Sequence, residues 1–387
     1  MMKWIPRQNV QAAILQSLKH YPVTVLLGPR QCGKTTLVRH LSFRGPITMF
    51  DLEDPETSLN PESASLILRH LTGLVIIDEC QRQPKLFELL RVLADRRPLP
   101  AHFLLLGSAS MEMVRGISES LAGRVAYVEM GGFSIEETGS GKAEKLWVRG
   151  GFPNAFLAKS DEDSHRWRMN FIQSFLERDL PQLGIRIPST ALRRFWTMLA
   201  HLHGQVWNAS DLARSMGVQE DTARRYLDVL TGVFMIRQLQ PWFVNTGKRL
   251  VKSPKVYFRD SGLLHSLLGI KMLSHLQAHP TLGFSWEGFA LEEVIRMASA
   301  DRDAFFYKTH SGSELDLLII RSGKSYGFEF KYGDAPQTTK SMHIVTQDLK
   351  LTQLFVVYPG RHIYPLAEKI DALPLTDVPA VLRRIPF

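Results

Sequence analysis

The stretch of sequence that decides the fold spans residues 28–36 and reads Gly28-Pro29-Arg30-Gln31-Cys32-Gly33-Lys34-Thr35-Thr36. A short apolar run at 23–27 precedes this stretch, and residues 37–41 follow it with helical spacing. A strand, the pattern G-x-x-x-x-G-K-T and a helix, in that order, are typical of a phosphate-binding loop. The loop amides and the helix N-terminus would point positive partial charge at a polyphosphate. The stretch therefore predicts a nucleotide-binding site.

The residue types within the loop match separate parts of a nucleotide. Gly28 and Gly33 permit a tight turn and a close approach of the backbone to phosphate. Lys34 is predicted to neutralise the β- and γ-phosphates, and Thr35 to offer its hydroxyl to Mg²⁺. We therefore predict ATP and Mg²⁺ as cofactors, with all residues of 28–36 as ATP-binding candidates.

A second apolar run, 74–77, ends in two carboxylates. Asp78 is predicted to hold Mg²⁺ through water, and Glu79 to polarise the attacking water, which favours hydrolysis over binding alone. The alternative is a strand end with two solvated acids. A third run, 104–106, leads to Ser108, which is either a sensor of the γ-phosphate or part of a simple turn.

Two arginines further along are candidates for contact with the transferring phosphoryl group. Arg124 stands just before the apolar run 125–129 and is a candidate sensor, or a finger that reaches a neighbour's nucleotide. Arg115 is a weaker candidate. For both residues the alternative is a solvated surface arginine.

The composition of the whole chain limits its class. A length of 387 residues predicts two or three domains, and 44% apolar residues provide ample core. No apolar run reaches 18 residues and no apolar signal segment opens the chain, so we expect no membrane association. Two cysteines, Cys32 and Cys80, form no disulfide framework and fit a cytoplasmic location. The formal charge of +9 favours an anionic partner, nucleic acid before a membrane.

Short aliphatic runs alternate with helical segments in the first third of the chain, after an amphipathic helix at about 7–20. This alternation predicts an α/β fold with a parallel sheet covered on both faces. A polar, glycine-rich stretch at 136–142 predicts a linker or loop. The predicted strands are 23–27, 47–51, 74–78, 102–106 and 125–129. The predicted domains are a P-loop domain at 1–140, a helical connector at 141–190, a winged-helix domain at 191–262 and a C-terminal α/β domain at 263–387.

The winged-helix prediction comes from two short helices and a hairpin. Ser210 is expected to cap a helix that breaks at Gly217, and 219–230 reads as the second helix of a helix-turn-helix. The runs 234–239 and 256–258 bracket a basic segment like a wing. Between 193 and 260, Lys and Arg outnumber Asp and Glu by 11 to 5, so +6 of the chain's charge falls here. DNA binding is the favoured interpretation, and a lid or oligomer contact is the alternative. The candidate phosphate contacts are Arg224, Arg225, Lys248, Arg249 and Lys252.

Carboxylates gather again near the C-terminus. Residues 313–320 and 326–331 read as two strands joined by a tight turn, with Glu329 and Lys331 on one face. Asp316 is expected beside them on the first strand. Such a set would hold Mg²⁺ and activate water against a phosphodiester. A helix that begins near residue 284 would add Glu287 or Glu292 as a ligand, although the same alternation occurs in any half-exposed strand.

Taken together, these residues resemble a family of bacterial and archaeal P-loop ATPases of the AAA+ group. In that family an AAA-type domain is followed by a C-terminal domain of unknown function. The resemblance spans nearly the whole chain and implies an AAA+ parallel-sheet domain. The stretches that carry it are 28–36, 78–79, 120–124, 150–153, 255–263, 286–287 and 314–316.

The C-terminal part is also similar to restriction-endonuclease-like nucleases, whose site is an Asp followed by Glu-x-Lys, often with a helical Glu. Asp316, Glu329 and Lys331 match this pattern, and Glu287 is the helical member. Leu315 stands where proline is usual before the first aspartate. The resemblance implies a nuclease-like fold more surely than a cutting activity.

Two functions follow as expectations. The first is an ATP-driven, DNA-processing enzyme that assembles into a ring or dimer and holds DNA, forked or branched DNA included. The second is a regulatory NTPase switch whose C-terminal domain is a non-cutting platform for protein or DNA. A small-molecule kinase is disfavoured because most of the chain lies beyond the P-loop domain and contains no recognisable acceptor pocket.

Overall fold

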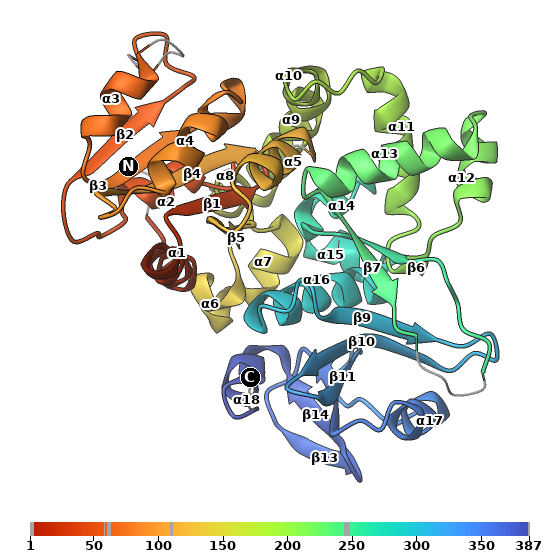
Figure 1. The fold of residues 1–387 in the computed structure, drawn as a ribbon. Coiled ribbons are helices and arrows are strands. Elements are labelled where there is room, and N and C mark those ends of the chain that lie inside the picture. Colours follow the sequence, from red (N-terminus) through yellow and green to blue (C-terminus); the bar gives the residue numbers. More distant parts are fainter. Residues whose placement is uncertain (1–3, 58, 60–62, 109–110, 244–247, 386–387) are drawn as a thin grey trace. The chain divides into compact units, whose positions relative to one another are not determined.

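The computed structural model describes residues 4–57, 59, 63–108, 111–243 and 248–385. The chain divides into two compact units (Figure 1). Unit 1 contains residues 1–132 and 232–234, and unit 2 contains residues 133–231 and 235–387. Each unit is described by itself below.

Unit 1 is built on a five-stranded, fully parallel sheet with the order β2-β3-β4-β1-β5. All the strands predicted for this region are present. Within the sheet, Leu27 pairs with Gly107 and Gly28 pairs with Ser108, so β1 and β4 end side by side. Ligands of such sheets bind at this carboxyl edge. The strands are β1 (Val23–Gly28), β2 (Ile47–Asp51), β3 (Gly73–Asp78), β4 (Ala101–Ser108) and β5 (Val125–Glu129).

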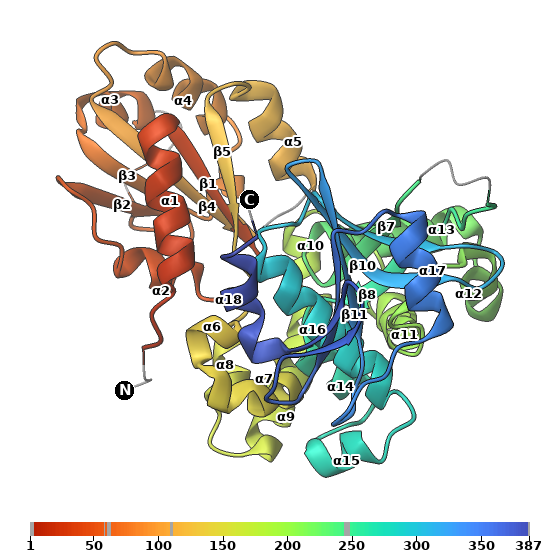
Figure 2. The same cartoon turned by 90° about the horizontal axis from the view of Figure 1, so that it is seen from below.

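Helices cover both faces of this sheet, which confirms the predicted α/β class. Val25 and Leu27 of β1 enter one apolar core, and Leu26 between them enters the other. The core around Leu26 is closed by α1 (Gln8–His20) and α2 (Lys34–Arg39), and Figure 2 shows α1 lying across the strands. The other core packs against α3 (Ala64–His70), α4 (Leu86–Ala94) and α5 (Met111–Ser120). A short 3-10 turn, η1 (Cys80–Arg82), follows β3.

The stretch at 136–142, predicted as a linker or loop, is helical and not an irregular loop. It forms α6 (Ile135–Thr138) and the 3-10 turn η2 (Ser140–Lys142) and leads into α7 (Ala143–Arg149). The Ser134 hydroxyl accepts from the Glu137 amide, and the Glu137 carboxylate accepts from the Ser134 amide. This capping box satisfies amides that begin the helix, and its S-x-x-E signature outweighs the neighbouring glycines.

The helical part of unit 2 continues with α8 (Pro153–Phe156), α9 (Asp161–Ser174), a π-helical turn (Phe175–Asp179) and α10 (Leu180–Gln182). Next come α11 (Ser189–Ala200), β6 (Gln205–Val206), α12 (Ala209–Met216) and α13 (Glu220–Gly232). The predicted helix pair is therefore present. Its first cap is Asn208 rather than Ser210, because the Asn208 side chain accepts from the amides of Ser210 and Asp211.

A nine-stranded sheet runs through unit 2 with the order β13-β14-β12-β11-β10-β9-β7-β8-β6. The strands β7 (Ile236–Pro241) and β8 (Lys255–Phe258) form the predicted antiparallel hairpin. Gln240 and Pro241 of β7 also pair in parallel with Phe305 and Phe306 of β9. The hairpin is thus continuous with the C-terminal strands, which the sequence patterns did not indicate.

The C-terminal strands are β9 (Ala304–Lys308), β10 (Glu314–Arg321), β11 (Lys324–Phe330), β12 (Gln353–Tyr358), β13 (Tyr364–Ala367) and β14 (Ile370–Pro374). The accompanying helices are α14 (Ser261–Leu267), α15 (Leu273–Gln277), α16 (Leu282–Met297), α17 (Lys340–Asp348), η4 (Leu375–Asp377) and α18 (Val378–Leu382). Ser322 and Gly323 have positive φ angles of 49° and 74° and form the tight turn between β10 and β11. The order α16, β9, β10, β11, α17, β12 frames the second candidate site.

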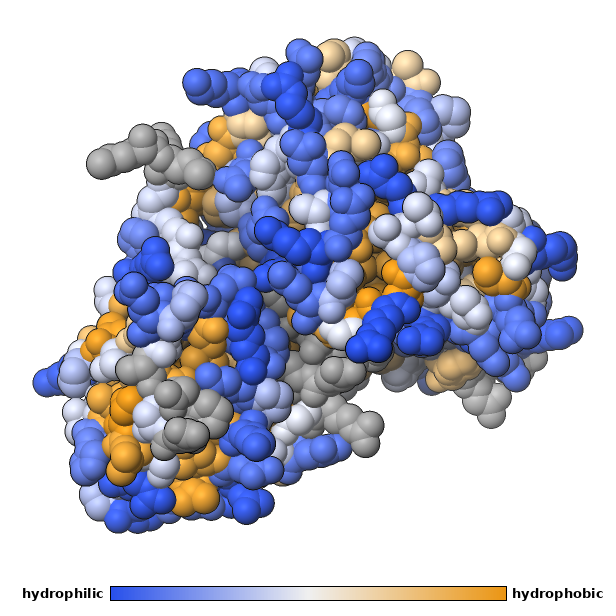
Figure 3. Space-filling model, turned by 90° about the horizontal axis from the view of Figure 1, so that it is seen from above, coloured by the Kyte–Doolittle hydropathy of each residue, from blue (hydrophilic) through white to orange (hydrophobic). Residues whose placement is uncertain are grey.

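The outer surface mixes polar and apolar side chains. On the face drawn in Figure 3, hydrophilic residues are interspersed with hydrophobic ones. Such a mixture is ordinary for folded domains. No helix among the described residues has both the length and the apolar character needed to cross a membrane.

Candidate functional site

The loop between β1 and α2 has the backbone that a phosphate site requires. Gln31 and Gly33 have positive φ angles of 61° and 97°, so the chain turns sharply before the helix. A Cβ atom at Gly28 would lie 2.0 Å from the Met130 carbonyl oxygen, which leaves room there only for glycine. The predicted strand, loop and helix are therefore assembled at the carboxyl edge of the sheet.

Lys34 lies inside the loop rather than extending from it. Its Nζ donates to the carbonyl oxygens of Gly28 and Pro29 at 3.0 and 2.9 Å. The side chain is buried. Both acceptors are neutral, so the ammonium charge is hydrogen-bonded but not neutralised.

Thr35 and Asp78 meet at the adjacent edge of β3. The Thr35 hydroxyl donates to the Asp78 carboxylate at 2.6 Å, and the Glu79 amide donates to the other Asp78 oxygen at 2.9 Å. A hydroxyl and a carboxylate in contact offer the hard oxygen ligands that Mg²⁺ prefers. These donors fit the predicted Mg²⁺, with Asp78 buried at the end of β3.

Glu79 follows Asp78 in a strained backbone conformation. Its φ angle of 52° is unusual for a residue other than glycine. The Gln81 amide donates to its carboxylate. Burial raises the pKa of Glu79 above the usual range, against the lowering effects of Gln81 and Lys34. A carboxylate with a raised pKa is a stronger general base.

The remaining loop residues have mainly structural neighbours. The Arg30 guanidinium lies 3.8 Å from the Glu53 carboxylate, and Cys32 is fully buried with its Sγ 3.5 Å from the Met130 carbonyl oxygen. Gln31 and Thr36 are exposed. Cys32 and Cys80 are both free and buried.

Arg7 belongs to this site and was missed by sequence reasoning. Its guanidinium donates to the carbonyl oxygens of Cys32, Gly131 and Gly132 at 3.2, 3.0 and 2.7 Å. The side chain is buried, so it ties the loop to the segment that follows β5. No local signal marks such a residue, since its acceptors are backbone groups up to 125 positions away.

Arg124 lies at the opposite edge of the sheet from the loop. Its carbonyl accepts from the Val23 amide at the start of β1, whereas the loop follows the end of this strand, about 16 Å further along. Its guanidinium is paired with both oxygens of Asp95 at 2.6 and 2.8 Å. A sensor role in its own chain does not fit this position, while a finger role toward a neighbour stays a prediction. The side chains of Ser108 and Arg115 lie outside the described residues.

The predicted nuclease residues come together in unit 2. Leu317 pairs with Phe328, which brings the adjacent Asp316 and Glu329 to the same end of the β10–β11 hairpin. Asp316 accepts from the Phe330 amide at 3.2 Å, and Lys331 lies 3.1 Å from the Glu329 carboxylate. Burial and then Asp316 raise the pKa of Glu329.

The helix α16 places Glu287 at this site but not Glu292. The Tyr257 hydroxyl donates to Glu287 at 2.6 Å, and burial and then Asp316 raise the pKa of Glu287. Glu292 is five residues further along and pairs with Arg237 and Arg259 instead. Of the two helical glutamates that were candidates, Glu287 is the one beside Asp316.

Lys255 stands at the centre of these acids, and sequence reasoning had counted it only as part of the wing's charge. Its Nζ lies 3.4 Å from Glu287, 2.5 Å from Glu314 and 3.4 Å from Asp316. Burial opposes its charge, but Tyr257 and the three carboxylates hold the pKa of Lys255 well above its usual range. Glu287, Glu314, Asp316 and Glu329 are called the carboxylate cluster below.

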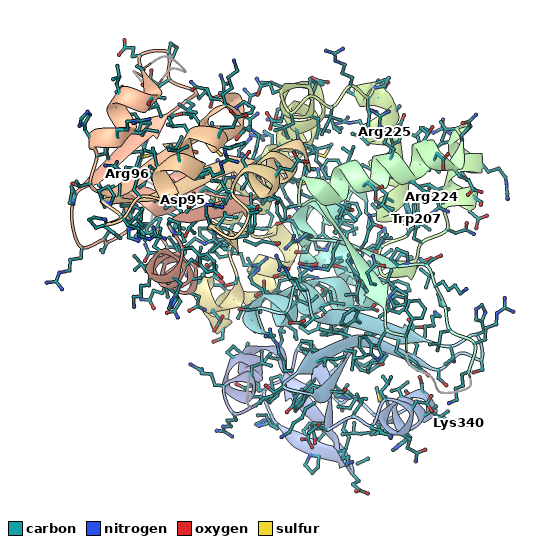
Figure 4. The ribbon with its side chains drawn as sticks, viewed as in Figure 1. Asp95, Arg96, Trp207, Arg224, Arg225 and Lys340 are labelled. Carbon is teal, nitrogen blue, oxygen red and sulfur yellow. The ribbon has the colours of Figure 1, made fainter. Side chains whose placement is uncertain are left out.

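The basic DNA-contact candidates are exposed, but several are paired. Arg224 and Arg225 lie on α13 (Figure 4), with Arg224 3.6 Å from Glu220. Lys248 lies 2.6 Å from Asp348, and Arg249 and Lys252 are exposed. The charge count over 193–260 therefore overstated the available positive charge, since Asp348 and other partners lie outside that window. Arg237, Arg259 and Lys255 are likewise bound to acids beyond residue 260.

Comparison with protein families divides the chain into three parts. Residues 20–139 match the AAA domain, residues 140–274 match a domain of unknown function, DUF8612, and residues 282–378 match another, DUF4143. Two curated relatives are uncharacterized proteins of Mycobacterium bovis and Mycobacterium tuberculosis. Each is 48% identical over 374 residues, which covers 97% of this chain and 85% of the relative.

The matching AAA domain and the phosphate loop define the class of protein, an AAA+ P-loop ATPase. The chain belongs to the same family as the two mycobacterial proteins. This confirms the resemblance seen in the sequence. The family's domain of unknown function at 282–378 contains Glu287, Asp316 and Glu329.

Solved structures with related folds are more distant. A Walker-type ATPase of Pyrococcus abyssi is 16% identical with a TM-score of 0.49, and the match covers 68% of this chain and 96% of that chain. A signal-transduction ATPase with a tetratricopeptide-repeat sensor from Pyrococcus horikoshii is 11% identical with a TM-score of 0.30, covering 77% and 46%. At these TM-scores the likenesses carry no argument about function.

Proposed function

We propose that the protein hydrolyses ATP at the site formed by Lys34, Thr35, Asp78 and Glu79. The observation that carries this proposal is the 2.6 Å contact between Thr35 and Asp78, next to the buried Lys34. When bound, Mg²⁺ neutralises charge on the phosphates. Lys34 would exchange its two neutral carbonyl acceptors for phosphate oxygens, Thr35 would supply its hydroxyl oxygen to the metal, and Asp78 would hold the metal through water. Glu79 accepts a proton from the attacking water.

Arg124 is proposed to act between subunits. Its distance from its own loop leaves a neighbouring subunit's nucleotide as the target for a phosphoryl-stabilising contact. Such a role requires homo-oligomerisation and the exchange of its Asp95 partner for phosphate. Two hydrogen bonds to Asp95 hold the guanidinium at the surface until then.

We also propose that hydrolysis drives the binding or remodelling of DNA, forked and branched DNA included. Support comes from α12 and α13, whose order with β6, β7 and β8 is that of a winged helix, and from the exposed Arg225, Arg249 and Lys252. The C-terminal order α-β-β-β-α-β, with Asp316 and Glu329 on adjacent strands, supports a nuclease-like fold.

One experiment tests both parts of the proposal. ATP turnover is measured alone and with single-stranded, duplex and branched DNA at two salt concentrations. We expect basal turnover that DNA stimulates, and DNA affinity that falls with salt because phosphate contacts release counterions. Turnover without any salt-dependent DNA binding would remove the DNA part and leave the ATPase. Absence of turnover under all conditions would remove the ATPase part.

The second candidate function is a regulatory NTPase switch. It is favoured by the pairing of Lys248 with Asp348 and of Arg237 with Glu292, which lowers the positive charge offered to DNA. In this case unit 2 is a platform for a protein partner, and turnover is slow and indifferent to DNA.

A further inference from the structure

The charge of the carboxylate cluster is largely offset by lysines of the same chain. Lys255, Lys308 and Lys331 each form an ion pair with one or more of its four acids. Lys255 lies innermost, with an exposed fraction of 2%. Lys308 and Lys331 lie at the rim, with side-chain exposures of 33% and 43%. The acids therefore face an ammonium group at the point where they converge.

The position of Lys255 is fixed by the sheet rather than by a flexible tail. Its backbone pairs with Leu239 of β7 on one side and with Val206 of β6 on the other. The side chain passes the Phe306 ring, whose centroid lies 5.8 Å from Nζ. Two residues on, Tyr257 projects to the same face of β8 and donates to Glu287. Neighbours on β6, β7 and β9 thus fix the position of Lys255, and with it the position of its ammonium group among the acids.

The donor set does not fit the metal that the nuclease resemblance implies. A Mg²⁺ site needs several oxygens at about 2.1 Å around a vacant centre. Here Glu287 and Asp316 each direct an oxygen to Lys255 at 3.4 Å. Within the described ranges, no three acidic, His or Cys side chains are arranged to hold a metal ion. A divalent cation at this point would also be repelled by the adjacent ammonium.

We propose that the Lys255 ammonium is the resident cation of the carboxylate cluster and takes the place of a divalent metal ion. The cluster is closed to Mg²⁺ and Mn²⁺ in the native protein, and the C-terminal domain does not use a metal to cut DNA. Removal of the ammonium alone leaves converging carboxylates without a central cation and creates a divalent metal site. This inference is independent of ATP hydrolysis and of DNA binding.

The test measures Mn²⁺ binding to the full chain by electron paramagnetic resonance of the free ion, without nucleotide. All chains carry Asp78→Asn, which removes the carboxylate predicted to hold Mg²⁺ beside the phosphate loop. In the chain with Lys255 we expect no Mn²⁺ site that depends on Asp316. In Lys255→Met we expect one new Mn²⁺ site, with an affinity at least tenfold higher than that of any Mn²⁺ binding to the chain with Lys255. Adding Asp316→Asn to Lys255→Met should abolish that site.

Lys331→Met is the matched control because it removes a lysine of the same cluster from the rim instead of the centre. It should create no site, and a gain equal to that of Lys255→Met would overturn the proposal. A Mn²⁺ site that is present with Lys255 in place and is lost in Asp316→Asn would overturn it as well. If Lys255→Met fails to fold, Lys255→Met with Glu314→Gln removes one charge of each sign. A folded double variant without a new site also contradicts the proposal.

Discussion

The phosphate loop of unit 1 and the carboxylate cluster of unit 2 contain the same types of residue but pair their charges in different ways. Each site combines a buried lysine with nearby acids. Lys34 donates to two backbone carbonyls and Asp78 accepts from a hydroxyl and an amide, so neither charge is neutralised by the other. In the cluster, Lys255 contacts three carboxylates directly.

This difference decides which site is ready for an external ion. Neutral partners are exchanged for a charged ligand at little electrostatic cost, whereas a buried ion pair gives up a strong interaction when one member leaves. The phosphate loop is therefore prepared for nucleotide and Mg²⁺, and the cluster is already satisfied. Residue type alone does not distinguish a ligand site from a closed one.

The largest effect is expected from Lys34→Ala. The change removes the charge that opposes the phosphates, so ATP affinity should fall by about 100-fold and turnover should be lost. Within its own chain the variant loses two hydrogen bonds to carbonyl oxygens and the electrostatic effect of Lys34 on Glu79, so we expect the fold to be retained. Calorimetric titration with ATP checks this, with the exposed Lys85→Ala as control. Unchanged affinity would mean that the loop does not bind the nucleotide as we propose.

Glu79→Gln should separate binding from chemistry at the same site. The amide keeps the shape and the contact with Gln81 but cannot accept a proton. Turnover should fall by about 100-fold or more, with ATP affinity retained. The exposed Glu88→Gln serves as control. If turnover persists at the native rate, another group positions the water. Burial raises the pKa of Glu79, so this base becomes protonated at a higher pH than an ordinary glutamate does. As the pH is lowered, native turnover should therefore begin to fall at a correspondingly higher pH.

Much of unit 1 could be predicted from its sequence because its signals are local. The apolar runs predicted the five strands. The G-x-x-x-x-G-K-T pattern predicted the loop between β1 and α2 that positions Lys34 and Thr35. The positions of Asp78 and Glu79 followed from the end of β3. Arg7 could not be predicted, since its three acceptors are backbone carbonyls that come together only in the folded sheet.

The sequence was less informative in unit 2 because the decisive contacts there are long-range. Asp316, Glu329 and Lys331 could be placed together from strand periodicity and a tight turn. The central role of Lys255 depends on Glu287 and Asp316, which are 32 and 61 positions away. A charge count over a window cannot detect such pairing, so it treated Lys255 and Lys248 as available to DNA.

A smaller effect is expected at the proposed DNA surface. Here too, a basic side chain that is paired with an acid is compared with basic side chains that are exposed to solvent. Arg249→Ala with Lys252→Ala should weaken DNA binding across sequences and reduce the salt slope by about two. Lys248→Ala should change the slope less, because Asp348 already holds its ammonium at 2.6 Å. Fluorescence anisotropy over a salt series measures both.

Arg224→Ala with Arg225→Ala tests whether α13 takes part, and Lys19→Ala with Lys85→Ala, two exposed lysines of unit 1, is the matched control. Equal slopes in all variants would place the DNA path elsewhere and favour the switch function.

The smallest effect concerns Glu293, a buried carboxylate of unit 2. Its interactions with Arg296 and the Ile135 amide only partly offset the effect of burial on its pKa. It accepts from the Ile135 amide at 2.8 Å and lies 3.2 Å from Arg296, yet burial raises its pKa to about 7. A folded-state pKa above the unfolded value of 4.5 contributes stability that is complete below pH 4.5 and is lost as the pH rises through about 7.

Glu293→Gln lacks this contribution. The melting temperature of the native chain relative to Glu293→Gln should therefore decline by a few degrees between these pH values and stay level above them. The exposed Glu144→Gln should show no such trend. A constant difference across the range would mean that Arg296 and the Ile135 amide fully compensate the burial of Glu293.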